Sequence, residues 1–160
     1  MKKLTFIASV LAVTFLTSCG GGEQSATATD QGNSSSTEEK TSNYDPKRGL
    51  GKFTAESITI SDKLDVAMAT TGESIAEVKC TSCHKATEEK LVGPGWKGVT
   101  TRRTPEWIMN FITNPDPMID KDPTVQALLE ICLVRMPNQN LSDDEARSIL
   151  EYMRKINGVN

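Results

Sequence analysis

Apolar side chains return at helical spacing in four stretches of the chain after residue 70. The clearest stretch is 123–132, with apolar residues at the i, i+3, i+4 and i+7 positions: Val125, Leu128, Leu129 and Cys132. Comparable apolar faces run along 105–113 and 143–157, and a weaker one leads from 72 to a cysteine at 80. Strand-like alternation is confined to 53–60. The pattern predicts an all-α domain of four or five short helices, preceded by a strand or extended strap at 44–60.

Start and stop signals frame the three strongest helices. Each begins with a capping residue followed by proline or acidic residues: Thr104-Pro105-Glu106, Asp122-Pro123 and Ser142-Asp143-Asp144-Glu145. The last of these has the S-x-x-E pattern of a capping box. Asn114-Pro115 is expected to end the first helix, and Gly158 the last.

The first 18 residues are interpreted as a signal peptide. Lys2 and Lys3 precede an apolar segment over 4–16, which is too short to span a bilayer comfortably. The segment ends in Leu16-Thr17-Ser18-Cys19, which resembles the lipobox of bacterial lipoproteins. The resemblance implies that Cys19 is acylated and becomes the N-terminus of a membrane-anchored protein, with its folded head in the periplasm.

Residues 19–43 are expected to form a tether between the lipid and the head. Of the 24 residues from 20 to 43, 17 are Gly, Ser, Thr, Asn or Gln, so the segment cannot bury enough apolar surface to fold. A flexible coil of that length spans roughly 25–30 Å. The folded head is therefore assigned to 44–160, with the possible strap at its start.

The charge balance and the set of reactive residues exclude several classes of function. The chain has 18 Lys and Arg against 21 Asp and Glu, a net charge of −3, which argues against nucleic acid as a main partner. Only 37% of residues are hydrophobic, which fits a folded head joined to segments that stay unfolded or are removed. A single histidine excludes multi-histidine metal sites, and four unevenly spaced cysteines are too few for a disulfide scaffold.

The single histidine directly follows a pair of cysteines, in Cys80-Thr81-Ser82-Cys83-His84. This C-x-x-C-H spacing is the attachment signature of c-type haem, because two thiols three positions apart reach the porphyrin vinyl groups and the adjacent imidazole faces the iron. Three alternatives stay open. A thioredoxin-like pair would need a βαβ context, a zinc site would need ligands beyond Cys132, and a plain disulfide can form in an exported protein.

Around this motif, over roughly residues 71–157, the chain resembles the class I monohaem cytochromes c. Gly72 stands eight residues before Cys80, where the family has a glycine at the crossing of its first and last helices. Ile149 and Tyr152 match the other side of that crossing. The resemblance implies the cytochrome c fold, with its short helices around one covalently bound haem c.

The segment Leu91-Val92-Gly93-Pro94-Gly95 resembles the Gly-Pro loop of the same family. By resemblance, the carbonyl of Pro94 accepts the Nδ1 hydrogen of His84, a bond that fixes the tautomer and strengthens the Nε2 donor. One departure is Ala76, which stands where the family usually has an aromatic residue. Two other aromatic residues are candidates to pack that haem edge: Phe53 and Phe111.

The second axial position is open to methionine, lysine, cysteine, water or no ligand, because no second histidine exists. Met136 lies in an Arg-Met-Pro-Asn segment between two helices, and Pro137 stiffens the backbone beside it. Relatives with this layout use the Met of a Met-Pro loop before the last helix, so Met136 is the expected ligand. Met118, in the loop that Asn114 begins, is the alternative, and the other methionines are assigned to packing or surface positions.

Five further residues are candidates for roles at or near the haem. Cys132 is expected to be a small buried apolar residue, with an interchain disulfide or a redox role as alternatives. The indole of Trp96 or Trp107 could donate to a haem propionate, with an arginine pairing its charge, or could simply pack on the porphyrin. The two candidate arginines are Arg102 and Arg103.

A haem with His and Met ligands has no open coordination position and suits one-electron transfer, so the chain is interpreted as an electron carrier and not an enzyme. Lys79 to Asn140 resembles the lipoprotein cytochromes that accompany nitrous oxide reductase. That resemblance implies a quinol-oxidising complex as donor and a periplasmic reductase as acceptor, with a terminal oxidase as another acceptor. The alternative function is a haem enzyme or a gas or redox sensor with a labile sixth ligand.

Overall fold

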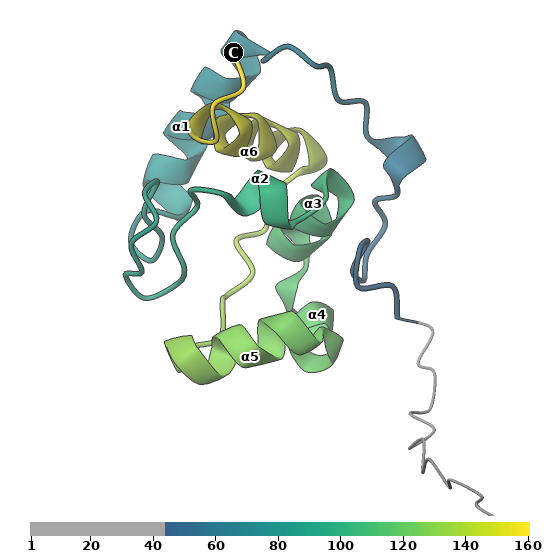
Figure 1. Cartoon of the computed structure of the whole chain (residues 1–160), viewed down its shortest axis with the longest axis vertical. Coiled ribbons are helices and arrows are strands. Elements are labelled where there is room, and N and C mark those ends of the chain that lie inside the picture. The colour runs from purple at the N-terminus through teal and green to yellow at the C-terminus, as the bar shows by residue number, and fades with distance from the viewer. Residues whose placement is uncertain (1–43) are drawn as a thin grey trace, which may run out of the picture. The chain divides into compact units, whose positions relative to one another are not determined.

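The computed structural model describes residues 44–160; the expected signal peptide at 1–18 and the expected lipidated tether at 19–43, which begins with Cys19, lie outside this range. Within it the chain forms six α-helices and one 3₁₀ turn (Figure 1): α1 Val66–Lys79, α2 Val99–Arg102, α3 Pro105–Thr113, α4 Pro115–Lys121, α5 Pro123–Cys132, α6 Asp143–Ile156 and the turn Ala55–Ser57. The described residues contain no strand, only an isolated bridge between His84 and Lys90. The all-α class is confirmed.

The helix count exceeds the four or five predicted. Helix α2 is a single turn, and α4 occupies residues that were expected to form a loop after Asn114. Asn114 ends α3, but Pro115 occupies the first turn of α4, a position where its fixed φ and missing N–H favour a helix. Met118 therefore lies in a helix and not in a loop. None of the helices in 44–160 has the length and apolar content to cross a bilayer.

The expected caps are present at the three strongest helices. The Thr104 side chain accepts from the N–H of Trp107, and Asp122 accepts from the N–H groups of Thr124 and Val125. Ser142 and Glu145 form the reciprocal capping box at the start of α6. These local signals fix the helix starts, and tertiary packing then arranges the helices.

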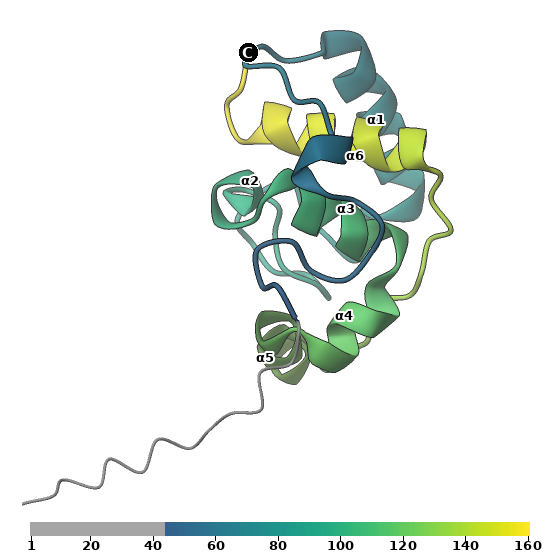
Figure 2. The ribbon, with the colours of Figure 1, turned by 90° about the vertical axis from the view of Figure 1, so that its right-hand side faces the viewer.

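Helices α1 and α6 cross at one end of the molecule, where Gly72 lets their backbones meet (Figures 1 and 2). A Cβ on Gly72 would lie 1.9 Å from the carbonyl oxygen of Ser148 and 2.8 Å from the amide nitrogen of Ile149. The crossing expected from the family resemblance is therefore confirmed, and only glycine fits at its centre.

Helices α4 and α5 lie at the opposite end, and α3 packs between the two ends (Figures 1 and 2). Helix α4 packs on both α3 and α5. The buried apolar side chains of α3, α4 and α6 join into one core, in which Ile108, Met118 and Ile149 are almost fully enclosed.

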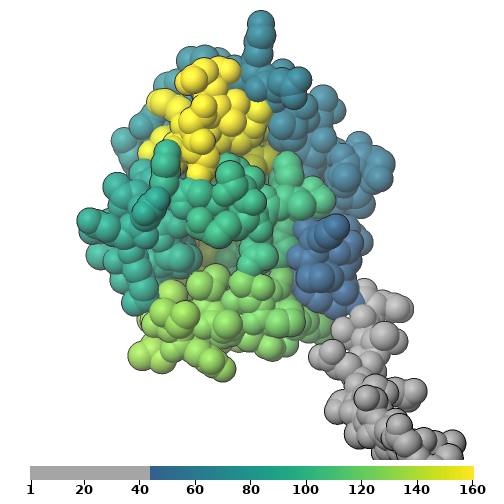
Figure 3. All heavy atoms as spheres, viewed as in Figure 1, coloured from purple at the N-terminus to yellow at the C-terminus, as the bar shows by residue number. Residues whose placement is uncertain are grey.

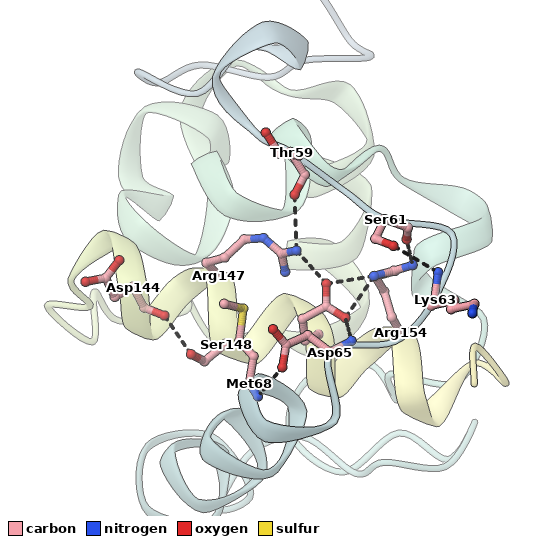
Figure 4. Close-up of polar contacts among 10 residues, drawn as sticks. Thr59, Ser61, Lys63, Asp65, Met68, Asp144, Arg147, Ser148 and Arg154 are labelled. Atoms are coloured by element: carbon pink, nitrogen blue, oxygen red, sulfur yellow. Dashed lines mark hydrogen bonds and ion pairs between the residues drawn. The ribbon is translucent and has the colours of Figure 1, made fainter.

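The N-terminal segment 44–65 is an extended strap, and the strand alternative is wrong. It runs from beside α5 to the start of α1 (Figure 2), where the N–H of Asp65 donates to the buried carboxylate of Glu151 on α6 at 3.4 Å. Figure 4 shows Asp65 at this end of the strap, with the side chains of Arg147 and Arg154 close to it. Arg154 Nη1 donates to both carboxylate oxygens of Glu151, at 2.7 and 2.8 Å, and Arg147 pairs with Oε1 at 2.5 Å. The two guanidinium groups also donate to strap carbonyls, those of Thr59 and Ser61.

Candidate haem site

The C-x-x-C-H segment forms a tight turn directly after α1. The N–H of Cys80 donates to the carbonyl of Ala76 at 2.8 Å and ends the helix. The N–H groups of Cys83 and His84 both donate to the carbonyl of Cys80, at 3.0 and 2.9 Å. The turn brings both thiols and the imidazole to one cavity. Neither Cys80 nor Cys83 forms a disulfide.

The imidazole of His84 is held on three sides. Its Nδ1 lies 2.8 Å from the Pro94 carbonyl, the hydrogen bond that the Gly-Pro loop predicts. Trp96 stacks on the ring, with centroids 5.6 Å apart, and a Cβ on Gly93 would lie only 2.4 Å from Cε1 of the ring. Burial lowers the pKa of His84, while the bond to Pro94 opposes that shift. The ring therefore stays neutral at pH 7, with Nε2 free to act as a ligand.

The cavity beside His84 has a volume of about 510 Å³ and is mostly apolar. That volume lies within the range of about 300–1,000 Å³ typical of ligand pockets. Five predicted site residues line it together: Cys80, Cys83, His84, Pro94 and Met136. A smaller adjoining cavity shares four of these five, all but Cys80, and extends toward α5. The space-filling view shows the surface hollowed between the segment after α1 and helix α5 (Figure 3).

The thiol of Cys80 lies in surroundings that favour uncharged sulfur. Burial raises the pKa of Cys80 to about 11; Lys79 lowers this pKa by a smaller amount, and Cys83 adds a small increase. Both thiols are half-buried. A thioether, which carries no charge, suits this environment better than a thiolate. Among residues 44–160, no three His, Cys, Asp or Glu side chains gather as the ligands of a metal ion would.

Comparison with protein-family models matches residues 69–157, more than half of the chain, to cytochrome c. The matched region contains the C-x-x-C-H turn, the Gly-Pro loop and Met136. The chain belongs to the cytochrome c family.

Solved structures agree with this assignment. Cytochrome c from Rhodothermus marinus matches with a TM-score of 0.61 and 35% identity, over 65% of this chain and 89% of that chain. An engineered cytochrome c from the same organism matches with a TM-score of 0.62 and 33% identity, over 70% of this chain and 97% of that chain. A further structure of the engineered protein, bound to a carbene intermediate, matches with a TM-score of 0.59 and 33% identity, with the same coverage. No curated protein sequence matches the chain.

This class I cytochrome c has one covalently attached haem c and transfers electrons through it. The residues present fit that group. The cavity carries two half-buried thiols at the attachment spacing, a neutral imidazole held flat against Gly93, and apolar walls. A zinc site, a thioredoxin-like pair and a simple disulfide are therefore set aside for Cys80 and Cys83.

Two methionines of the cytochrome line the larger cavity, Met136 and Met153. Met153 is 2% exposed within the core face of α6, which agrees with a packing role. Met136 is half-buried in the irregular segment between α5 and α6, and it alone of the two also lines the smaller cavity with His84. Met118 lines neither cavity and is completely buried.

The predictions for aromatic residues at the haem cavity are partly wrong. Phe111 lines the cavity, whereas Phe53 does not and donates its N–H to Asn110 at 2.9 Å. The indole N–H of Trp107 donates to Asp122 at 2.8 Å, so the prediction that this N–H donates to a haem propionate is wrong. Trp96 stacks on His84, a role that its position after the Gly-Pro loop did not reveal.

The two arginines and the spare cysteine also have defined places. Arg102 and Arg103 both line the cavity; Arg102 donates to the Lys97 carbonyl, and the Arg103 guanidinium lies 4.6 Å from the Trp107 ring centroid. Cys132 is half-buried and not fully buried, because it ends α5 beside the smaller cavity, where the chain turns away. It forms no disulfide in the described part of the chain.

Proposed function

We propose that this cytochrome c is a membrane-tethered periplasmic one-electron carrier whose second axial ligand is Met136. The observation that carries the ligand assignment is that Met136 lines both adjoining cavities together with His84. The Met-Pro segment before the last helix, where relatives with this layout have their ligand, supports the same residue.

The chain's own residues would keep the site rigid during electron transfer. Haem held by His and Met ligands accepts and releases one electron, and the Met ligand raises its potential. The Pro94 carbonyl and the Trp96 ring fix the orientation of His84, and Pro137 restricts the backbone beside Met136. The mostly apolar cavity walls would limit the access of water to both ligands. The two haem carboxylates would pair with the cavity-lining Arg102 and Arg103.

The cellular setting follows from the N-terminal sequence. Residues 1–18 direct export, Cys19 carries the lipid, and 19–43 tether the head so that it can reach partners near the membrane. On this proposal the protein is an anchored lipoprotein with its folded head in the periplasm.

The proposed donor is a membrane quinol-oxidising complex, and the proposed acceptor is a periplasmic terminal reductase. The resemblance of 79–140 to the cytochromes that accompany nitrous oxide reductase supports that reductase, with a terminal oxidase as the other acceptor. Co-purification of the tethered protein with its partner, followed by stopped-flow oxidation of the reduced cytochrome by each acceptor, tests the pairing. Oxidation by neither acceptor would contradict it.

A second function, a haem enzyme or sensor with a labile sixth ligand, has one specific observation in its favour. The engineered relative from Rhodothermus marinus is bound to a carbene intermediate. The absorption spectrum of the purified protein separates the two functions. The carrier shows the weak far-red band of ferric haem with a sulfur ligand and binds no carbon monoxide when reduced. A high-spin spectrum that shifts with carbon monoxide would favour the enzyme or sensor.

A further inference from the structure

A buried carboxylate joins three separate segments of the molecule at the start of α5. Asp122 is 1% exposed, and both of its oxygens accept hydrogen bonds. Oδ1 accepts from the N–H groups of Thr124 and Val125, at 2.8 and 3.1 Å, and so caps α5. Oδ2 accepts from the Trp107 indole on α3 and from the hydroxyl of Tyr44, where the strap begins.

The four donors to Asp122 are neutral, and no Lys or Arg forms an ion pair with it among the described residues. A buried carboxylate is costly unless it is hydrogen-bonded. The position of Asp122 therefore depends on Tyr44 and Trp107, and α5 cannot shift away from either without leaving that charge unsatisfied. Trp107 in turn lines the haem cavity.

Helices α4 and α5 and the segment after them behave as one unit. Arg135, next to Met136, donates to Asp116 at 3.1 Å and to Asp120 at 3.0 Å, both on α4. Gln126 on α5 donates to the carbonyl of Asp120 at 2.8 Å. The segment that carries Met136 is thus tied back to α4, and these contacts join it to the α4–α5 unit.

This unit is held to the other end of the molecule by apolar packing and by one buried polar group. Helix α4 packs on α3, and Met118 fills the space under Gly49 of the strap, where a Cβ would lie 2.5 Å from its Cε. Asp122 supplies the polar attachment, since among residues 44–160 it alone links the start of α5 to both α3 and the strap by hydrogen bonds. Figure 2 shows the described chain beginning beside α4 and α5.

We propose that Asp122, with Tyr44, is a positioning residue for the axial methionine: it holds the α4–α5 unit against α3 and the strap, and so keeps Met136 over the haem. The proposal rests on the proposed ligation by Met136. Neither residue touches the ligand, and their effect is on how readily the Met136 segment moves away from the cavity. Loosening the attachment makes the methionine easier to displace.

The proposal is tested in the full chain by measuring how tightly imidazole binds the ferric haem in competition with Met136. Asp122→Asn keeps an oxygen for the α5 cap, but it places an NH₂ group opposite the Trp107 N–H. Tyr44→Phe removes only the hydroxyl that donates to Asp122. We expect imidazole to bind about ten-fold more tightly to D122N and about three-fold more tightly to Y44F, because each loses bonds to a buried carboxylate. The far-red sulfur band then disappears at correspondingly lower imidazole concentrations.

Two variants control for general effects. Tyr152→Phe changes the only other tyrosine, and Asp65→Ala removes a comparable aspartate cap from α1, outside the α4–α5 unit. Both should bind imidazole within about two-fold of wild type. Equal affinity in wild type, D122N and Y44F would overturn the proposal, as would an equal gain in Asp65→Ala. If D122N does not take up haem, Y44F decides alone. A wild-type protein without the sulfur band would overturn the Met136 assignment itself, and the positioning role with it.

Discussion

At the scale of single residues, the reduction potential depends on the atom that Met136 presents to the haem. A thioether sulfur donates less to ferric iron than an imidazole does, so Met136→His should keep two axial ligands and lower the potential by roughly 100–300 mV. Met136→Ala should leave the position open, so that the reduced protein binds carbon monoxide. Redox titration and carbon monoxide difference spectra measure the two effects.

Met118 provides the matched control for these variants. Because it is fully buried in α4, Met118→Leu conserves its volume and should change neither the potential nor carbon monoxide binding. If Met118→Leu abolished the far-red band while Met136→Ala retained it, Met118 would be the ligand.

The ionised carboxylate of Asp122 is also expected to make the stability of the fold depend on pH in acid. Burial acts to raise the pKa of Asp122, but hydrogen bonds from Tyr44, Trp107 and the α5 backbone outweigh it and lower the pKa below its ordinary 3.8. A carboxyl with a depressed pKa stabilises the fold above its unfolded pKa, and this stabilisation is lost as the pH falls through the folded pKa. Below about pH 4, denaturant unfolding should therefore show a steeper loss of stability in wild type than in D122N. Parallel slopes would contradict the assignment of an ionised Asp122.

At the scale of elements, the crossing of α1 and α6 has the least tolerance for change. Gly72→Ala would place a methyl group against the backbone of Ser148, which cannot move aside as a flexible side chain can. We expect the free energy of unfolding to fall by at least about 2 kcal/mol, even though alanine gains ~1 kcal/mol of helix propensity. Thermal or denaturant unfolding measures the loss.

The exposed Thr70 on the same helix supplies the comparison for Gly72. Thr70→Ala should change stability by no more than about 0.5 kcal/mol, because the Thr70 side chain is exposed and its hydroxyl bonds only within α1. If Gly72→Ala were as stable as Thr70→Ala, the two backbones would not meet as closely as the structure has them.

The elements that could be predicted are those whose signals are local in sequence. The caps at Thr104, Asp122 and Ser142 fixed three helix starts, and the apolar spacing gave the buried faces of α3 and α6. On α5 only Val125 of the predicted apolar face is buried, because the other three residues line the smaller cavity: Leu128, Leu129 and Cys132. Helix α4 was missed because Asn114-Pro115 both ends one helix and begins the next. The strap could not be assigned, because its path depends on contacts with residues far along the chain, such as Glu151 and Asn110.

At the scale of the whole molecule, the residues of the site could be predicted from local motifs, whereas the contacts that surround the site could not. The C-x-x-C-H turn, Pro94 and Met136 could be named from sequence because each lies in a short motif, and the structure brings them to one cavity. The link from Tyr44 to Asp122 spans 78 positions and has no motif, so only the folded chain reveals it. It ties the first described residue, next to the proposed tether, to the helix that leads to Met136.

The proposed lipid anchor at Cys19 determines where the whole protein is found in the cell. Once residues 1–18 are removed, the acyl chains on Cys19 are the only stable membrane attachment that the proposed function provides. Cys19→Ala should therefore leave the cytochrome either soluble in the periplasm or uncleaved, as fractionation and the mass of the haem-stained band would show. Cys132→Ala removes the cysteine at the end of α5 and should stay in the membrane fraction with its haem. If cleaved Cys19→Ala protein still sedimented with membranes, the attachment would lie elsewhere, and the tether would not set the reach of the head.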